Sequence, residues 1–373
     1  MEPGLQSTCP LSISSLYIAD QNILGNGLSQ SNMTTPDPEI LYSLLARMRD
    51  AGVEYVFMEV SSHALYQCRT DAIEFDCAVF TNLTQDHLDF HGNMENYYKA
   101  KEKLFVQSRR AVVNTDDASG RRLIRSLERA DGRFKTCSRS TGDFCALFEK
   151  HARPCGIEYL CKSDEGEYRI SLPNFAGEFQ VMNSLQAAAV ASMYGIPAQT
   201  IQQAFENMDG VCGRLERVLL HPKQEIEIYI DYAHTPDALE RLLQSVRHLR
   251  HNTSRILLLF GCGGDRDKDK RRLMGQIASK LSDMVIVTSD NSRSEEPGAI
   301  ICDILNGINK EKPYAVISDR AEAIERAIKD YARRGDILVL AGKGHERYEI
   351  GADGVRAFDE REIVSRVLSD LYA

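Results

Sequence analysis

From about residue 226 onward, the sequence alternates short apolar runs with longer amphipathic segments. We predict β-strands at 226–230, 256–261, 284–288 and 337–341, with a weaker strand at 314–317. We predict helices between and after these strands, at 236–249, 269–281, 296–307, 320–334 and 359–371. This alternation predicts an α/β domain whose mostly parallel sheet is covered by helices on both faces.

The first half of the chain offers similar elements in a less regular order. The apolar run at 55–60 suits a strand buried on both faces, as do the runs at 75–80 and 110–113. Residues 133–172 contain several short β-like runs and predict a small β-rich insert. Helices are expected before the first of these strands and after the insert, at 38–51, 183–194 and 199–207.

These patterns divide the chain into three parts. Residues 1–31 show no clear period and form an irregular N-terminal segment. A central domain is expected at 32–217 and a C-terminal domain at 218–373, with the boundary near a turn at His221-Pro222.

Composition and charge narrow the class of function. The 373 residues carry 45 basic and 54 acidic side chains, a net charge of −9, so no general basic surface for nucleic acid is expected. The ten cysteines include no CxxC pair, which favours reduced thiols in a cytoplasmic protein. The sequence lacks a secretory signal pattern, and its apolar runs are of strand length, so we expect no membrane insertion. We also expect a monomer.

Polar clusters in the first half of the chain could carry chemistry. Met58-Glu-Val-Ser-Ser-His63 follows a predicted strand and offers a carboxylate, two hydroxyls and an imidazole, although a plain helix N-cap by Ser61 or Ser62 is the alternative. The loop at 81–91 holds paired Asp and His, which suits magnesium and phosphate chemistry better than a solvated loop does.

A third cluster lies on the predicted helix at 97–105. Lys99 and Lys103 share one face of this helix, and a solvated charged face explains both. Lys101 points elsewhere, among apolar residues of the same turn, and is less well explained in that way.

Three charged loops follow three predicted strands of the second half, at 261–271, 290–295 and 342–346. Their glycines allow a backbone to approach a ligand closely, and their charges could bind an anionic or zwitterionic substrate. Because ligands bind at the carboxyl edge of open α/β sheets, the three loops together predict a binding site.

Taken together, these segments resemble the Mur ligases of peptidoglycan synthesis, most of all those that add the third residue to the UDP-N-acetylmuramoyl-dipeptide. The resemblance runs from about Asn32 to the C-terminus. It rests on motifs in the family's order: Thr34-Thr-Pro36, Glu59-Val-Ser-Ser-His63, Thr81-Asn-Leu-Thr…Asp86-His87, Tyr97…Lys101, Gly261…Arg271 and Gly342-Lys-Gly-His-Glu346. It implies an α/β fold: a Mur ligase central ATPase-like domain with a parallel or mixed sheet, incomplete at its N-terminus, and a Rossmann-like C-terminal domain.

The resemblance also implies the residues of the site. Magnesium would be held by Glu59, His87 and a carbamylated Lys101, which are the expected catalytic residues. The UDP-N-acetylmuramoyl-dipeptide would contact Thr34, Thr35, Ser61, Gln67 and Arg69, and the adenosine part of ATP would contact Asn183, Arg214 and Asp231. The incoming amino acid would contact Arg271, Asp290, Asn291, Arg293, Gly342 and Glu346.

The reaction implied by the resemblance is ATP-dependent formation of an amide bond. ATP converts the D-Glu carboxylate to an acyl phosphate, which the amine of the amino acid then attacks, and magnesium with cationic side chains suits the charge on the phosphoryl oxygens. We expect meso-diaminopimelate as the amino acid, because Arg293 can pair with its distal carboxylate in a bidentate way. Ser292 stands where the family usually has Pro, which should loosen this loop.

The sequence departs from the family at one point. Mur ligases carry a glycine-rich P-loop ending in Lys-Thr before the Thr-Thr-Pro motif, whereas Gly25-Asn-Gly-Leu-Ser29 contains no lysine. A domain for the uridine nucleotide also has no counterpart in the sequence. We therefore expect weak turnover if the stated start is the native one. The alternatives are a lysine-adding ligase, a non-catalytic substrate-binding remnant and a folylpolyglutamate synthase-like ligase.

Overall fold

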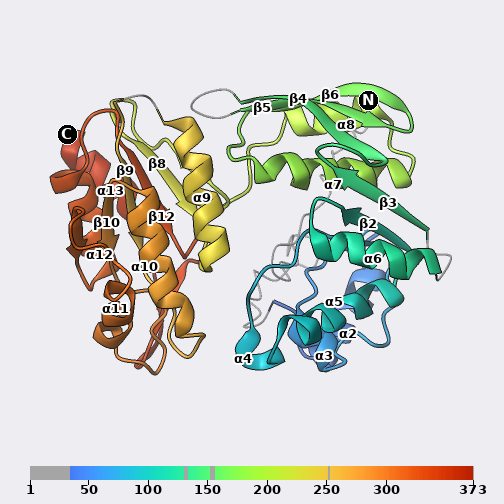
Figure 1. The fold of residues 1–373 in the computed structure, drawn as a ribbon, viewed down its shortest axis with the longest axis horizontal. Helices are drawn as coiled ribbons and strands as arrows, with labels where there is room; N and C mark the ends of the chain where they lie inside the picture. The colour runs from blue at the N-terminus through green and yellow to red at the C-terminus, as the bar shows by residue number, and fades with distance from the viewer. Residues whose placement is uncertain (1–33, 130–132, 152–155, 251–252, 373) are drawn as a thin grey trace, which may run out of the picture. The chain divides into compact units, whose positions relative to one another are not determined.

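A computed structural model describes residues 34–129, 133–151, 156–250 and 253–372. It contains two compact units (Figure 1). The described residues of unit 1 lie within 34–83, 91–113 and 117–134, and those of unit 2 lie within 84–90, 114–116 and 135–372.

Unit 1 is built mainly from helices around a short parallel strand pair. Its helices are α2 (Pro38–Asp50), α3 (Ser62–Tyr66), α5 (Met94–Val106) and α6 (Ala118–Arg129). Strand β1 (Ala78–Phe80) pairs in parallel with β2 (Arg110–Asn114). The core contains Phe80, Tyr97, Phe105, Val113 and Leu123. The predicted helix at 38–51 and the strand at 110–113 are confirmed, whereas the strand expected at 75–80 begins only at Ala78.

The prediction of a buried strand at 55–60 is wrong. These residues adopt no regular element, and Tyr55, Val56 and Phe57 are 59%, 41% and 43% exposed. An apolar run becomes a central strand only where strands lie on both sides of it and layers cover both faces. Among the described residues, no strand is paired with this run, so its apolar composition misled the sequence analysis.

The first part of unit 2 contains the β-rich insert that the sequence predicts. Strand β3 (Arg133–Ser138) pairs in parallel with β4 (Phe144–His151), and β5 (Ile157–Ser163) and β6 (Gly166–Leu172) continue as antiparallel strands. Helices α7 (Phe179–Met193) and α8 (Ala198–Glu206) follow, and α7 begins earlier than expected. The Tyr159 hydroxyl lies 2.9 Å from the Ser184 hydroxyl, which joins α7 to this sheet.

The second part of unit 2 is a six-stranded sheet in the order β11-β10-β9-β12-β8-β7. Its strands are β7 (Glu216–Val218), β8 (Glu227–Asp231), β9 (Ile256–Phe260), β10 (Met284–Val287), β11 (Tyr314–Val316) and β12 (Ile337–Ala341). All neighbouring pairs are parallel except β7 with β8 at the edge. Every strand predicted for the second half is confirmed, and β7 is an addition.

Helices cover both faces of this sheet, as Figure 1 shows in yellow to red. They are α9 (Pro236–Leu249), α10 (Asp269–Leu281), α11 (Pro297–Leu305), α12 (Arg320–Arg326) with the π-helical turn η1 (Ala327–Tyr331), and α13 (Glu360–Tyr372). Alternate residues of β9 face opposite sides: Leu258 and Phe260 pack with α9, α10 and α11, whereas Leu257 and Leu259 pack with α12 and α13. The central strand is therefore buried on both faces.

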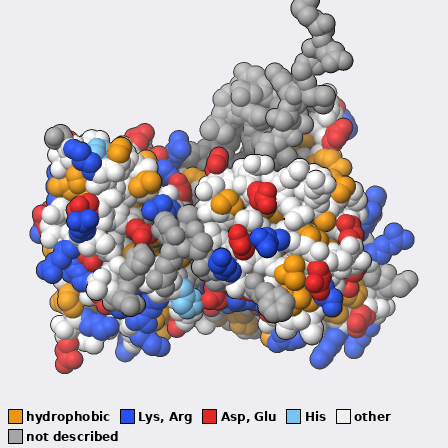
Figure 2. Space-filling model, turned by 90° about the horizontal axis from the view of Figure 1, so that it is seen from above, with side chains coloured by type: hydrophobic (Ala, Val, Ile, Leu, Met, Phe, Trp, Pro, Cys, Tyr) orange, Lys and Arg blue, Asp and Glu red, His pale blue; other side chains and the backbone are white. Residues whose placement is uncertain are grey.

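One element near the C-terminus was not predicted from the sequence. Strands β13 (Tyr348–Gly351) and β14 (Gly354–Ala357) form an antiparallel hairpin after β12. In the described ranges, no helix combines the length and apolarity that crossing a bilayer requires. Acidic, basic and apolar side chains are interspersed over the face drawn in Figure 2.

Candidate functional site

In unit 1, the residues expected to bind the muramoyl-dipeptide lie around the buried Thr35. The Thr35 hydroxyl donates to the Glu59 carbonyl (3.0 Å) and accepts from the Ser61 backbone N–H (3.0 Å). The Arg69 guanidinium donates to the Thr35 carbonyl (2.8 Å) and to the Gln67 side chain (2.5 Å). The structure therefore brings this sequence-predicted set together, with Thr34 next to it in the chain.

Ser61 also caps a helix. Its hydroxyl accepts from the Ala64 backbone N–H (3.2 Å), and its extended backbone begins α3. The alternative explanation, a helix N-cap, is thus confirmed for Ser61. The two explanations are compatible, because the same hydroxyl has a second acceptor lone pair.

The expected magnesium ligands are divided between the units. Glu59 and Lys101 belong to unit 1, and His87 belongs to unit 2. The Lys101 Nζ lies 5.8 Å from the centre of the Tyr97 ring, and the His87 Nδ1 lies 3.5 Å from the Asp86 carboxylate. Within the described residues, no group of three His, Cys, Asp or Glu side chains is arranged to hold a metal. The ligand set stays a prediction.

Two of the three expected adenosine contacts lie together at the end of β8. The buried Asp231 carboxylate accepts from the backbone N–H groups of Leu215 (2.6 Å) and Ala233 (2.8 Å). The Arg214 guanidinium stacks over the Tyr232 ring at 5.0 Å. Asn183 lies on α7, where its amide donates to Gln180 (3.3 Å). Burial raises the pKa of Asp231 to about 6, against the opposing effect of its two backbone hydrogen bonds.

The segment around Arg214 is held tightly against the loop that follows β12. A Cβ on Gly213 would lie 2.3 Å from the His345 nitrogen, so only glycine fits there. Arg361 of α13 donates to Glu216 and to the Gly344 carbonyl (3.2 Å). Leu215 has a φ of 46°, a strained conformation for a branched residue. The Asp231 carboxylate holds its N–H in place.

The residues expected to bind the amino acid meet at the carboxyl ends of β10 and β12. The Asn291 side chain joins the two loops: its oxygen accepts from Lys343 (3.0 Å) and the Ile350 N–H (2.9 Å), and its amide donates to Glu346 (2.8 Å). Asn291 thus orders the site. Gly342 has a φ of 114°, and a Cβ there would lie 3.0 Å from the Asp290 carboxylate.

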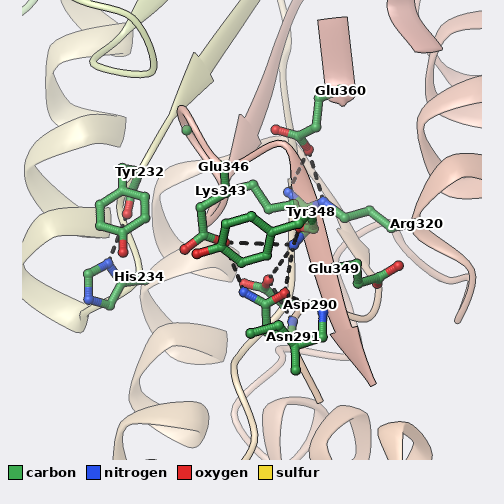
Figure 3. A network of polar contacts seen from close by, with 12 residues as sticks. Tyr232, His234, Asp290, Asn291, Arg320, Lys343, Glu346, Tyr348, Glu349 and Glu360 are labelled. Carbon is green, nitrogen blue, oxygen red and sulfur yellow. Dashed lines mark hydrogen bonds and ion pairs between the residues drawn. The ribbon is translucent and has the colours of Figure 1, made fainter. Parts of the chain in front are cut away.

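Lys343, which the sequence analysis did not select, occupies the centre of this arrangement (Figure 3). Its side chain is 0% exposed. Its Nζ lies 3.2 Å from the Asp290 carboxylate and 3.8 Å from that of Glu346, and it donates to the Tyr348 carbonyl (3.0 Å). A lysine is rarely buried without partners, so its place inside the Gly342–Glu346 motif was the available signal.

The charged side chains around Lys343 shift one another's pKa values. Burial disfavours the ionised form of Asp290, but the nearby Lys343 and Arg320 charges outweigh it and hold the pKa of Asp290 below its ordinary value. Burial, reinforced by the Asp290 charge, raises the pKa of Glu346. Burial and the neighbouring Arg266 lower the pKa of Arg293.

Arg293 is held between two loops. It has a φ of 53°, its backbone N–H donates to the Ile350 carbonyl (3.0 Å), and its guanidinium donates to the Gly264 carbonyl (3.0 Å). The next residue, Ser294, donates through its hydroxyl to Asp265 (2.7 Å). The loop around Ser292 is therefore fixed by hydrogen bonds in place of the proline that the family usually has.

The glycines after β9 serve loop packing. A Cβ on Gly264 would lie 1.9 Å from the Ser292 carbonyl oxygen, and a Cβ on Gly261 would lie 2.5 Å from that of Thr288. The glycines therefore let this loop approach the backbone that carries Asp290 and Arg293.

Arg271 supports these loops from below the surface. Its side chain is 1% exposed, and its guanidinium pairs with Glu295 (2.8 Å) and Asp303 (2.9 Å). In this conformation, the Arg271 guanidinium is already paired with these two carboxylates. Direct contact between Arg271 and the amino acid stays a prediction.

Arg320 is another buried cation, and it links the ends of β10 and β12. Arg320, at the start of α12, donates to Glu360 (2.9 Å), to the Ala341 carbonyl (2.8 Å) and to the Ser289 carbonyl (3.3 Å). These two carbonyls immediately precede Gly342 and Asp290. Sequence analysis missed Arg320 and Glu360 because their pairing joins residues 40 positions apart.

The arrangement after β10 and β12 can recognise charge of both signs. It offers the carboxylates of Asp290 and Glu346 for an ammonium group, and the guanidinium of Arg293 for a carboxylate. In the part of the chain that the structure describes, all eight cysteines have free thiols; Cys9 and Cys155 lie outside it.

Family models match most of the chain. The model described as "Mur ligase middle domain" matches residues 11–191, and the model described as "Mur ligase, glutamate ligase domain" matches residues 213–344. The first match begins within the segment 1–31. The domain boundaries expected from the sequence stay predictions.

Individual proteins are similar over nearly the whole chain. A protein of Caldanaerobacter subterraneus subsp. tengcongensis, named UDP-N-acetylmuramoyl-L-alanyl-D-glutamate–2,6-diaminopimelate ligase, is 42% identical over 94% of this chain and 71% of its own length. A solved structure of a ligase with the same name is 33% identical, with a TM-score of 0.60 over 93% of this chain and 72% of that one.

A more distant solved structure shares the fold. Folylpolyglutamate synthase of Mycobacterium tuberculosis, solved with ADP and AMPPCP, is 23% identical, with a TM-score of 0.59 over 74% of this chain and 62% of its own. At this identity, the likeness shows the fold alone.

Proposed function

The chain belongs to the Mur ligase family, and from this premise we propose that it is an ATP-dependent ligase that joins 2,6-diaminopimelate to UDP-N-acetylmuramoyl-L-alanyl-D-glutamate. The relatives with this name support the substrate pair. Relatives of the same fold solved with adenine nucleotides support ATP as the co-substrate.

The observation that carries the choice of amino acid is the pairing of both charge signs at one site. Arg293 lies within electrostatic reach of the carboxylates of Asp290 and Glu346. The distal end of diaminopimelate carries an ammonium and a carboxylate, whereas lysine ends in an ammonium alone. With lysine in this site, the Arg293 guanidinium would have no ligand carboxylate to pair with, which disfavours lysine.

The other parts of the substrates have separate residues in this proposal. Thr34, Thr35, Ser61, Gln67 and Arg69 bind the muramoyl-dipeptide, and Asn183, Arg214 and Asp231 serve the adenosine. Magnesium, when bound, would neutralise charge on the phosphoryl oxygens. Lys101 could act as one of its ligands only as the carbamate, because an ammonium has no lone pair for a metal.

The test is calorimetric binding of meso-diaminopimelate and L-lysine to the purified full chain. We expect diaminopimelate to bind more tightly. Arg293→Ala should weaken its binding by about 1.5–3 kcal/mol, the range for a hydrogen bond to a charged group. Lysine should bind weakly before and after the change.

The matched control is Arg326→Ala, which removes an exposed guanidinium of α12 that pairs with Asp330. It should leave both affinities unchanged. Tighter binding of lysine than of diaminopimelate by the unmutated chain would refute the choice of substrate. Mass-spectrometric detection of the UDP-linked tripeptide after incubation with ATP tests the ligation itself.

A further inference from the structure

The polar cluster at the ends of β10 and β12 contains a charge that no assigned substrate contact uses. We define the charge cluster as Asp290, Arg293, Lys343 and Glu346. Lys343 is fully buried, and its Nζ is satisfied by Asp290, the Asn291 oxygen and the Tyr348 carbonyl. Asp290 and Asn291 belong to the loop after β10, and Tyr348 begins β13 (Figure 3).

The formal charges of this cluster sum to zero. Asp290 and Glu346 contribute two negative charges, and Arg293 and Lys343 contribute two positive ones. The adjoining buried ions are balanced separately, because Arg320 pairs with Glu360 (2.8 Å) and Glu349 pairs with Arg356 (2.5 Å). A neutral site fits the zwitterionic distal end of diaminopimelate, which also has no net charge.

Without Lys343, the same cluster would carry a net charge of −1. One buried and one partly buried carboxylate with a single guanidinium would then favour a ligand end with a net positive charge. The distal ammonium of lysine has that charge.

We propose that Lys343 is a specificity-determining positioning residue, which fixes Asp290, Asn291 and Glu346 and, by its charge, makes the site prefer a zwitterionic amino-acid end over a cationic one. This inference rests on the proposed function of the same site. It assigns the preference to two residues, Arg293 by direct pairing and Lys343 by charge balance from inside the fold.

Lys343→Met tests the charge at nearly constant volume. In the purified full chain, we expect the ratio of lysine to diaminopimelate affinity, measured by calorimetry, to rise by about tenfold or more, because a unit charge is removed at close range. The double variant Lys343→Met/Asp290→Asn restores neutrality. The amide oxygen that replaces the Asp290 carboxylate could still accept from the Asn291 N–H, as the carboxylate does (2.7 Å), so this variant should bring the ratio back toward the unmutated value.

Lys329→Met is the matched control, because Lys329 pairs with Glu325 on the surface. It should leave the ratio unchanged. A folded Lys343→Met variant with an unchanged ratio overturns the proposal, as does a double variant with the same ratio as the single one. If neither Lys343 variant folds, Lys343 serves stability alone and the proposal also fails.

Measurements on the same protein variants distinguish failure of this inference from failure of the proposed function. If the unmutated chain binds neither amino acid, the proposed function fails, and the unfolding midpoints then decide the role of Lys343. A higher midpoint for the double variant than for Lys343→Met supports charge balance as the role of Lys343. Equal midpoints overturn it.

Discussion

Asp231 shows how burial changes a single ionisable group. Its carboxylate is 6% exposed and holds the Leu215 N–H, so it stabilises a strained turn while carrying the cost of its own desolvation. The sequence resemblance assigned it only to adenosine. In the structure, it also fixes the segment that precedes β7.

The raised pKa of Asp231 predicts a pH dependence of stability. The folded state keeps a proton up to about pH 6, whereas the unfolded state loses it near the ordinary pKa of 3.8. Because the folded state binds the extra proton, stability falls as pH rises through this window, by about 3 kcal/mol for a shift of about two units.

Urea unfolding of the unmutated chain and of Asp231→Asn, each at pH 4.5 and pH 7, isolates this group. Asn removes the titration, so the variant should lose less stability than the unmutated chain between the two pH values. An identical pH dependence in the two proteins would show that Asp231 ionises normally.

Lys101 carries the second prediction at this scale. If it acts as a carbamate, Lys101→Ala should weaken magnesium binding, measured by calorimetry, and short carboxylic acids with added bicarbonate should partly restore it by supplying oxygen ligands. Lys99→Ala is the matched control, because Lys99 is an exposed partner of Glu95 on the same helix. Equal behaviour of the two variants would return Lys101 to a solvated helix face.

At the scale of elements, the loops after β9 and β10 act as one structure. The Gly264 N–H donates to the Asn291 carbonyl (2.9 Å), and the Asp265 N–H donates to Glu295 (2.7 Å). The sequence predicted that these glycines approach a ligand. The structure shows that at Gly261 and Gly264 the close neighbour is the other loop.

Gly264→Ala should therefore disturb the site through packing. Its Cβ would lie 1.9 Å from the Ser292 oxygen, so the 290–293 loop must shift. We expect a destabilisation of about 1–3 kcal/mol and weaker diaminopimelate binding, measured by thermal unfolding and calorimetry.

Gly298→Ala is the control, because it lies in α11 with open space around its Cβ position. It should stabilise the protein slightly, by about 0.5–1 kcal/mol. Full retention of stability and binding in Gly264→Ala would mean that the two loops are more adaptable than their spacing indicates.

At the scale of the whole molecule, the proposed reaction needs ATP and magnesium together, because magnesium and cationic side chains stabilise charge on the phosphoryl oxygens. We expect formation of the UDP-linked tripeptide to stop when ATP is withheld or when a chelator removes magnesium. Mass-spectrometric detection of the tripeptide measures this, and tripeptide formation without ATP would contradict the proposed ligation.

The sequence by itself determined the second half of the molecule. The alternation of apolar runs and amphipathic segments predicted every parallel strand of its six-stranded sheet, because strands buried on both faces must be apolar throughout. It did not predict the antiparallel edge strand β7. The same logic failed at 55–60, where the run is apolar but no strand among the described residues pairs with it. The composition of a segment shows whether it is suited to burial. Only the strands and helices that pack against it determine whether it is buried.

Part of the candidate site could likewise be predicted from the sequence, and part of it could not. The motifs pointed to Asp290, Arg293 and Glu346, because polar residues directly after buried strands lie at the ligand-binding edge of the sheet. Lys343, Arg320 and Glu360 became visible only in the tertiary structure. Each is buried and paired with residues from other parts of the chain, 40 positions away for Arg320 and Glu360 and 52 positions away for Lys343 and Asn291. Long-range electrostatic pairing leaves no periodic signal in a sequence, so only the folded chain could show which charges balance which.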